Sequence, residues 1–187
     1  MTAWRAFLVA CATGLAGAAQ ATAVSPEPSD YRMEEYRAPT PSTLSGATVL
    51  TTEQAHALWS DRRAAFIDVL PRPPRPQGLP ASTIWHPKPR SDIPGSIWLP
   101  DTGYGALAPV MEAYFERGLA QASAGDQSSV LVFYCLRNCW MSWNAAKRAM
   151  TLGYTHVAWY RDGTDGWEAH GFPTEAREPA PRPSASE

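Results

Sequence analysis

The stretch VLVFYCLRNCWMSWNAAKRAM, residues 130–150, places the tightest limit on what this chain can fold into. Residues 130–134 form an unbroken apolar run rich in β-forming residues, which is typical of a central strand in a parallel sheet. From about residue 142 to residue 152, small and apolar residues recur at helical spacing, so a helix is expected there. Cys135 and Cys139 lie between the two patterns. The sequence therefore predicts two thiols at the point where a buried strand gives way to a helix.

The rest of the chain repeats this order of strand and helix. Thr51 and Gln54 have the spacing of a capping box, which predicts a helix start. Alternating strands and helices predict a single α/β domain with a small parallel sheet. In such sheets ligands bind beyond the carboxyl ends of the strands, which is where Cys135 lies. Strands are expected at residues 48–50, 65–69, 97–99 and 156–160, and helices at 52–62 and 109–122, with a last helical turn at 167–170.

The beginning of the chain is expected to be a targeting segment. Residues 1–23 combine a positive residue, an Ala-rich apolar run and small-x-small cleavage sites, which is typical of a secretory signal peptide. The apolar run is shorter than the ~20 residues needed to span a bilayer. We therefore expect a periplasmic protein with no membrane span in its mature form. A lipoprotein signal that includes Cys11 is the alternative. Removal of the signal peptide also removes Cys11, so the mature protein is expected to contain only Cys135 and Cys139.

Composition divides the remaining chain into three parts. Residues 24–46 are rich in Pro, Ser and Glu and are expected to form an extended lead-in, and residues 47–173 form the domain. Residues 174–187 form a Pro-rich tail that is expected to be loosely held. Within the domain, residues 71–90 hold seven prolines, which predicts a long irregular surface loop.

Charge and histidine placement exclude several classes of function. Lys+Arg number 16 and Asp+Glu number 18, and neither sign clusters, so we expect no nucleic-acid surface. The four histidines are not paired at ligand spacing, which argues against a zinc site. A haem attachment motif would need Cys-x-x-Cys-His, which is absent. We therefore expect no metal and no cofactor.

Two interpretations of the cysteine pair remain open. A structural disulfide closing so short a loop contributes about 2 kcal/mol on chain-entropy arguments. A reactive thiol instead requires a lowered pKa, and a shift from about 8.5 to about 6 needs roughly 3.4 kcal/mol. A helix dipole supplies at most about 2 kcal/mol. The reactive interpretation therefore predicts a curled loop that aims several backbone N–H groups at one solvent-facing sulfur, assisted by Arg137.

Five segments in order carry a resemblance to a known family. They are FIDVLP, DIPGSIWLP, VFYC, NAAKRAMTLGY and VAWYRDGTDGWEAHGFP. Together they resemble the landmarks of a rhodanese domain over about residues 47–173. The loop CLRNCWMSWNAAKRA is similar to that of exported rhodanese-like proteins with a CxxxCW motif, which are associated with alcohol catabolism that depends on pyrroloquinoline quinone.

The resemblance implies a fold, an activity and a site. The fold would be a small parallel sheet flanked by helices on both faces. Cys135 would be the nucleophile that takes a sulfane sulfur from thiosulfate or another donor as a persulfide, and passes it to an acceptor thiol or cyanide. Asp68 would support the loop by anchoring its neighbours. The substrate-binding loop would comprise Leu136, Arg137, Asn138, Trp140, Met141 and Ser142.

The loop also departs from the usual rhodanese pattern. It lacks glycine, is one residue longer than the six-residue type, and contains Cys139. A second thiol there is expected to resolve a Cys135 persulfide, releasing sulfide and leaving a disulfide. The expected partners are a small sulfur compound or a partner thiol, together with a quinoprotein alcohol dehydrogenase system. The alternative is a non-catalytic binding or maturation accessory with a structural or redox-regulated disulfide.

Overall fold

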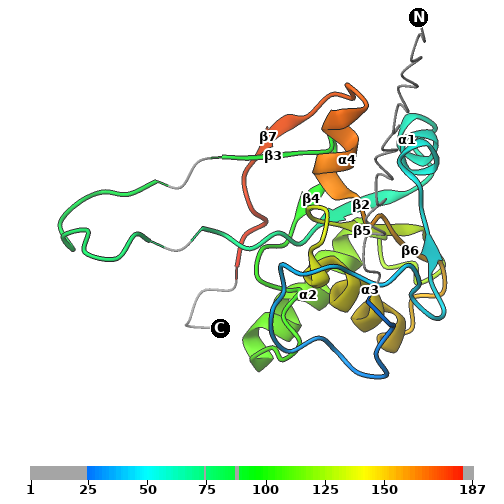
Figure 1. Cartoon of the computed structure of the whole chain (residues 1–187), viewed down its shortest axis with the longest axis horizontal. Coiled ribbons are helices and arrows are strands. Elements are labelled where there is room, and N and C mark those ends of the chain that lie inside the picture. Colours follow the sequence, from blue (N-terminus) through cyan, green and yellow to red (C-terminus); the bar gives the residue numbers. More distant parts are fainter. Residues whose placement is uncertain (1–24, 74, 87–88, 183–187) are drawn as a thin grey trace, which may run out of the picture.

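The computed structural model describes residues 25–73, 75–86 and 89–182. The expected signal peptide, the first residue of the lead-in and the last five residues of the tail lie outside this part of the chain. Figure 1 shows the arrangement of the helices and strands. In chain order they are β1 (Thr48–Val49), α1 (Thr52–Ser60), β2 (Ala65–Asp68), β3 (Arg90–Asp92), β4 (Ile97–Trp98), α2 (Pro109–Ala122), β5 (Leu131–Tyr134), α3 (Trp140–Thr151), β6 (Val157–Trp159), α4 (Gly163–Ala169) and β7 (Glu175–Arg177).

The core of the domain is a five-stranded sheet in the order β1-β6-β5-β2-β4, and every neighbouring pair is parallel. This confirms the predicted α/β domain with a parallel sheet. β5 lies at the centre, and its register with β2 aligns Tyr134 with Asp68. Both strands therefore end at the same level, and Cys135 follows at that edge of the sheet.

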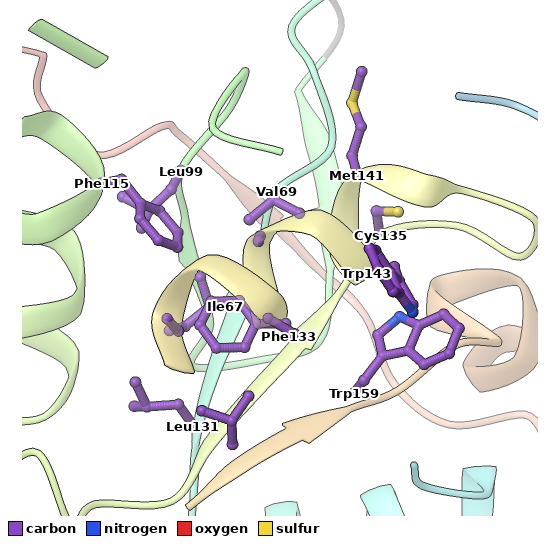
Figure 2. Close-up of a cluster of buried hydrophobic side chains, with 14 of the residues drawn as sticks. Ile67, Val69, Leu99, Phe115, Leu131, Phe133, Cys135, Met141, Trp143 and Trp159 are labelled. Atoms are coloured by element: carbon purple, nitrogen blue, oxygen red, sulfur yellow. The ribbon is translucent and has the colours of Figure 1, made fainter. Parts of the chain in front are cut away.

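Helices flank the sheet on both faces. Alternate residues of β5 point to opposite faces, as in any strand. Leu131 and Phe133 pack in one cluster with residues of α2 and α3, part of which is shown in Figure 2. Val132 and Tyr134 pack in a second cluster with residues of α1 and α4. The same alternation explains why the β5 sequence is apolar throughout.

Helix boundaries follow local signals where these are present. The capping box at α1 is confirmed, since Gln54 N donates to Thr51 Oγ1 and Thr51 N donates to Gln54 Oε1. α3 begins at Trp140, about two residues earlier than expected, because extended Cys139 serves as its N-cap. α4 begins at Gly163, so the expected last turn is the end of a longer helix.

α3 is buried on nearly all sides, which its sequence pattern did not predict. Arg148 is charged and yet is only 8% exposed. Its guanidinium donates to the carbonyls of Thr102, Tyr104 and Gly105, which fixes the loop before α2 against the helix. The lead-in covers another side of α3, where Lys147 Nζ donates to Ser29 O.

The tail is held more firmly than its composition indicates. β7 pairs antiparallel with β3, and this pair aligns Arg90 with Arg177. Farther along, Ala180 N donates to Trp98 O and Ala180 O accepts from the Tyr114 hydroxyl. The expectation of a loosely held tail is therefore wrong over residues 175–180, because backbone pairing holds it. Between β2 and β3 the proline-rich loop extends away from the body of the domain (Figure 1).

None of the helices in the described residues is both long enough and apolar enough to cross a membrane.

Candidate functional site

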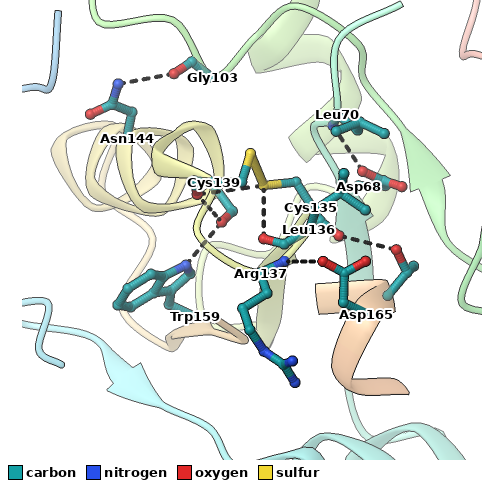
Figure 3. Close-up of a disulfide and its surroundings, with 12 residues drawn as sticks. Asp68, Leu70, Gly103, Cys135, Leu136, Arg137, Cys139, Asn144, Trp159 and Asp165 are labelled. Carbon is teal, nitrogen blue, oxygen red and sulfur yellow. Dashed lines mark hydrogen bonds between the residues drawn. A yellow bond between two sulfur atoms is a disulfide. The ribbon is translucent and has the colours of Figure 1, made fainter. Parts of the chain in front are cut away.

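Cys135 and Cys139 are joined by a disulfide at the carboxyl end of β5 (Figure 3). Cys135 directly follows the strand, and Cys139 is the N-cap of α3. Their Cα atoms are 6.4 Å apart. The two residues are 0% and 2% exposed, within the apolar cluster that also contains Trp140 and Trp143. The pair is thus presented as a buried disulfide and not as an open thiol.

Oxygen atoms, not amides, face the sulfur of Cys135. Its Sγ lies 3.7 Å from Leu136 O and 3.5 Å from Cys139 O. In the described part of the chain no backbone N–H is hydrogen-bonded to this sulfur. The expected solvent-facing cradle of amides is therefore wrong for the disulfide-bonded structure. Carbonyl oxygens carry partial negative charge and disfavour an anion, so formation of a thiolate requires the loop to rearrange after reduction.

The backbone of the cysteine loop is held chiefly by the start of α4, through both a loop carbonyl and a loop amide. Thr164 N donates to Cys135 O at 3.0 Å, and Arg137 N donates to Asp165 Oδ2 at 3.0 Å. Leu136 forms an antiparallel bridge with Gly163. Gly163 has φ +53°, and a Cβ there would lie 2.3 Å from Cys135 O. A glycine is thus required for α4 to approach the cysteine loop so closely.

Arg90 ties three parts of the site together. Its Nε donates to Asp68 Oδ2 at 2.6 Å, and its Nη2 donates to Thr164 Oγ1 at 3.0 Å. Nη2 also lies 3.4 Å from Cys135 O. The second carboxylate oxygen of Asp68 accepts from Leu70 N at 2.8 Å. One guanidinium therefore connects the end of β2, the start of α4 and the carbonyl of the first cysteine.

A second buried acid lies beside this network. Burial raises the pKa of Asp68, against the opposing charge of Arg90. Burial, and then the charge of Asp68, raise the pKa of Asp92 to about 7. Arg177 Nε is 3.8 Å from Asp92 Oδ1, and neither carboxylate oxygen has a hydrogen-bond partner among the described residues. Asp92 is therefore partly protonated near neutral pH, two residues from Arg90.

The predicted loop residues divide into two groups. Arg137 and Asn138 are exposed, whereas Leu136 is half-buried. Asn138 has φ +55°, a left-handed conformation that asparagine tolerates. Arg137 Nε lies 3.3 Å from Asp162 Oδ1, an exposed pair that contributes little to stability.

The other three predicted loop residues lie in the first turn of α3 and are buried. Trp140 and Met141 are 1% and 5% exposed, and Ser142 is fully buried. Ser142 Oγ donates to Cys139 O at 3.2 Å and accepts from Trp159 Nε1 at 3.0 Å. These residues support the loop from behind and do not line an open surface.

Sequence reasoning missed Arg90, Thr164 and Asp165. Arg90 was assigned to the irregular proline-rich loop, and no local pattern connects it with Asp68. Thr164 and Asp165 had a usable signal, because Thr and Asp are common in the first turn of a helix and here they follow a predicted strand closely. Within residues 25–73, 75–86 and 89–182, no three His, Cys, Asp or Glu side chains are grouped as metal ligands.

A model of the rhodanese-like domain family matches residues 51–170, most of the chain. The chain belongs to this family. Among solved structures, the rhodanese-like domain is similar to thiosulfate sulfurtransferase from Pseudomonas aeruginosa, with a TM-score of 0.50 and 20% identity. That match covers 75% of this chain but 22% of the Pseudomonas chain. A search of curated proteins found no match.

Two more solved structures are similar at a lower score. The polysulfide-sulfur transferase homodimer from Wolinella succinogenes has a TM-score of 0.45 and 18% identity, covering 72% of this chain and 82% of the other. A rhodanese-like domain from Anabaena sp. has a TM-score of 0.45 and 19% identity, covering 76% and 91%. At these identities the likeness to the Pseudomonas structure establishes the fold alone.

Proposed function

We propose that this rhodanese-like protein takes up sulfane sulfur on Cys135, and that Cys139 resolves the resulting persulfide by forming the disulfide unless an acceptor thiol takes the sulfur first. The observation that carries the proposal is the Cys135–Cys139 disulfide at the carboxyl end of the central strand, the edge at which parallel sheets bind ligands. The activities named for the fold relatives, thiosulfate and polysulfide sulfur transfer, agree with it.

The chemistry balances in two steps. In the first, the Cys135 thiolate attacks the outer sulfur of thiosulfate, the sulfur–sulfur bond of thiosulfate breaks, and sulfite leaves with the electron pair. In the second, the Cys139 thiolate attacks Sγ of the Cys135 persulfide, which releases hydrogen sulfide ion and forms the protein disulfide. An external dithiol then reduces the disulfide and is itself oxidised. Transfer of the persulfide sulfur to another acceptor thiol competes with the second step.

The setting of this chemistry is part of the proposal. Residues 1–23 carry the features of a signal peptide, so we place the mature protein in the periplasm. The CxxxCW motif supports an accessory role in quinoprotein-dependent alcohol oxidation, with a small sulfur compound or a partner thiol as substrate. Export also exposes the cysteine pair to an oxidising compartment, where a disulfide persists until a dithiol reduces it.

A second candidate is a non-catalytic binding or maturation accessory. It is favoured by the burial of both cysteines, at 0% and 2% exposure, and by the carbonyl oxygens that face the sulfur. In that case the disulfide only braces the loop. Replacing both cysteines by serine separates the two: full support of alcohol oxidation by the double variant would eliminate the catalytic function.

The direct test follows sulfur on the mature protein. The protein is reduced, freed of reductant, treated with thiosulfate and measured by intact mass spectrometry. We expect Cys139→Ser to keep one added sulfur atom, wild type to release sulfide and lose two hydrogens, and Cys135→Ser to do neither. If Cys139→Ser gains no sulfur although its Cys135 thiol reacts with an alkylating agent, the transfer proposal is wrong.

A further inference from the structure

The lead-in contains a segment, residues 29–36, that we call the strap. We propose that the strap is a releasable cover on the first turn of α3, and that its release controls how fast a dithiol reaches the Cys135–Cys139 disulfide. Its biological meaning rests on the proposed function, but its structural basis and its test do not. The proposal is carried by contacts that join the strap to the residues beside Cys139.

Asn144 holds the backbone of the strap in two directions. Its Oδ1 accepts from Arg32 N at 2.9 Å, and its Nδ2 donates to Arg32 O at 2.9 Å and to Gly103 O at 3.0 Å. Asn144 is fully buried in the middle of α3. A side-chain amide that satisfies both backbone groups of one residue imitates the pairing of an adjacent strand. The strap is therefore recognised through its main chain.

Tyr36 connects the strap with the cysteine loop. Its carbonyl accepts from Trp140 N at 2.9 Å, and Trp140 is the residue after Cys139 and the first of α3. The Tyr36 hydroxyl accepts from Gly105 N at 3.1 Å and donates to Met33 O at 2.8 Å. The strap thus occupies the first N–H of the helix, a group that is otherwise available to stabilise an anion at the helix start.

The surface under the strap is shaped for close backbone approach. A Cβ on Gly105 would lie 2.4 Å from Met33 Sδ and 2.5 Å from Arg32 O, so any larger residue pushes the strap away. Charged groups of α3 add to the contact: the Arg148 guanidinium lies 4.7 Å from the centre of the Tyr31 ring, and Lys147 Nζ donates to Ser29 O at 2.8 Å. The strap therefore packs closely and specifically against α3 and the loop that contains Gly105.

The strap is nevertheless weakly anchored compared with the core. It forms no helix or strand, and Met33, Glu34 and Glu35 are exposed. Glu35 has φ +48°, a left-handed conformation that costs a non-glycine residue about 1 kcal/mol. The strap is held in place mainly by hydrogen bonds, each of which contributes about 1 kcal/mol net to stability. Local opening of the strap is therefore cheaper than global unfolding of the domain.

Release of the strap has two consequences for the disulfide. It frees the N–H of Trp140, and it removes one restraint on the helix turn that begins at Cys139. Cys135 and Cys139 are buried while the strap is seated. A dithiol must attack one of the two sulfurs along the line of the bond, so reduction follows opening. The rate of reduction then reports the population of the open state.

Reduction of the mature chain by dithiothreitol, followed by alkylation and intact mass measurement, tests the proposal. Gly105→Ala dislodges the strap and is expected to speed reduction roughly tenfold, the effect of losing one or two hydrogen bonds from the closed state. The matched control is Gly118→Ala on α2, where the atoms nearest to an added Cβ belong to the Leu99 side chain, at 2.5 Å, and not to the strap. Its global stability is expected to fall without a comparable gain in reduction rate.

The outcomes separate the two proposals. If Gly118→Ala speeds reduction as much as Gly105→Ala does, the disulfide is reached by global unfolding and the strap proposal is overturned. An unchanged rate in a folded Gly105→Ala also overturns it. Tyr36→Phe, which loses a single hydroxyl, serves as the milder variant and is expected to speed reduction severalfold. If the strap variants behave as expected but Cys139→Ser takes no sulfur from thiosulfate, the strap proposal is supported and the sulfur-transfer proposal is wrong.

Discussion

Arg90 Nε lies 2.6 Å from Asp68 Oδ2, although a proline-rich loop of about twenty residues separates them in sequence. The same guanidinium reaches Thr164 Oγ1 and Cys135 O. The carboxylate is fully buried and the arginine side chain is 11% exposed. This ion pair therefore holds the sheet, the cysteine loop and α4 in fixed positions relative to one another around Cys135.

Removing the arginine of this pair is expected to destabilise the protein strongly. Arg90→Met leaves the Asp68 charge buried without its partner, which typically costs about 3–5 kcal/mol. Urea unfolding followed by circular dichroism measures the change. Arg63→Met is the matched control, because Arg63 pairs with Asp61 on the surface at 3.8 Å, and we expect a change below about 0.5 kcal/mol. Equal effects of the two substitutions would contradict the role given to Arg90.

The raised pKa of Asp92 predicts how stability depends on pH. Its pKa is about 7 in the folded protein against an ordinary value of 3.8, so between these values the folded state binds more protons than the unfolded state. The contribution of Asp92 to stability is therefore present at low pH and is lost as pH rises from about 4 to about 7. Asp92→Asn is expected to flatten the stability profile in this range, measured by urea unfolding at several pH values. The exposed substitution Glu116→Gln is the control, and an identical profile for wild type and Asp92→Asn would refute the assignment.

Two glycines with positive φ offer a paired test of the contact between α4 and the cysteine loop. A Cβ at Gly163 would lie 2.3 Å from Cys135 O, whereas a Cβ at Gly171 would meet nothing within 4 Å. Gly171→Ala is expected to cost about 1–2 kcal/mol, the price of the left-handed conformation alone. Gly163→Ala is expected to cost about 3 kcal/mol or more, because the clash adds to that cost. Thermal unfolding of both variants gives the comparison, and similar losses would show that α4 approaches the loop less closely.

Reduction of the disulfide is expected to lower the free energy of unfolding by about 2 kcal/mol, the loop-entropy value for so short a ring. Urea unfolding with and without a dithiol measures the difference. Cys135→Ser/Cys139→Ser is the control, since a reductant should leave its stability unchanged. A loss well above this value would mean that the reduced loop repacks, with the buried core around Trp140 disturbed.

The sheet was predictable because its signals are local. The apolar run before Cys135 and the capping box at Thr51 each depend on a few consecutive residues, and both predictions are confirmed. The position of Cys135 at the carboxyl edge of the sheet follows from strand order alone. The α/β class and the place of the cysteine pair were therefore within reach of the sequence.

The surroundings of the pair were not predictable, because they depend on contacts between distant residues. Arg90 reaches Asp68 only because β3 pairs with β7, more than eighty residues farther along the chain. Asn144 is buried where the lead-in and the loop at Gly103 both lie against α3. Val110 of α2 is apolar but 51% exposed, because the inner face of the helix is formed by Tyr114, Phe115 and Leu119. Burial and hydrogen-bond direction around Cys135 were decided by these long-range contacts.

The ion pair between Asp68 and Arg90 also joins the two ends of the long proline-rich loop between β2 and β3. Changes in the length or sequence of the rest of the loop are therefore expected to leave its two ends bound to each other and to the cysteine loop. We therefore expect a cut near Gly78 to leave two fragments that stay associated through this ion pair and through the pairing of β2 with β5. We expect that this loop can be shortened, lengthened or replaced with little effect on the Cys135–Cys139 disulfide.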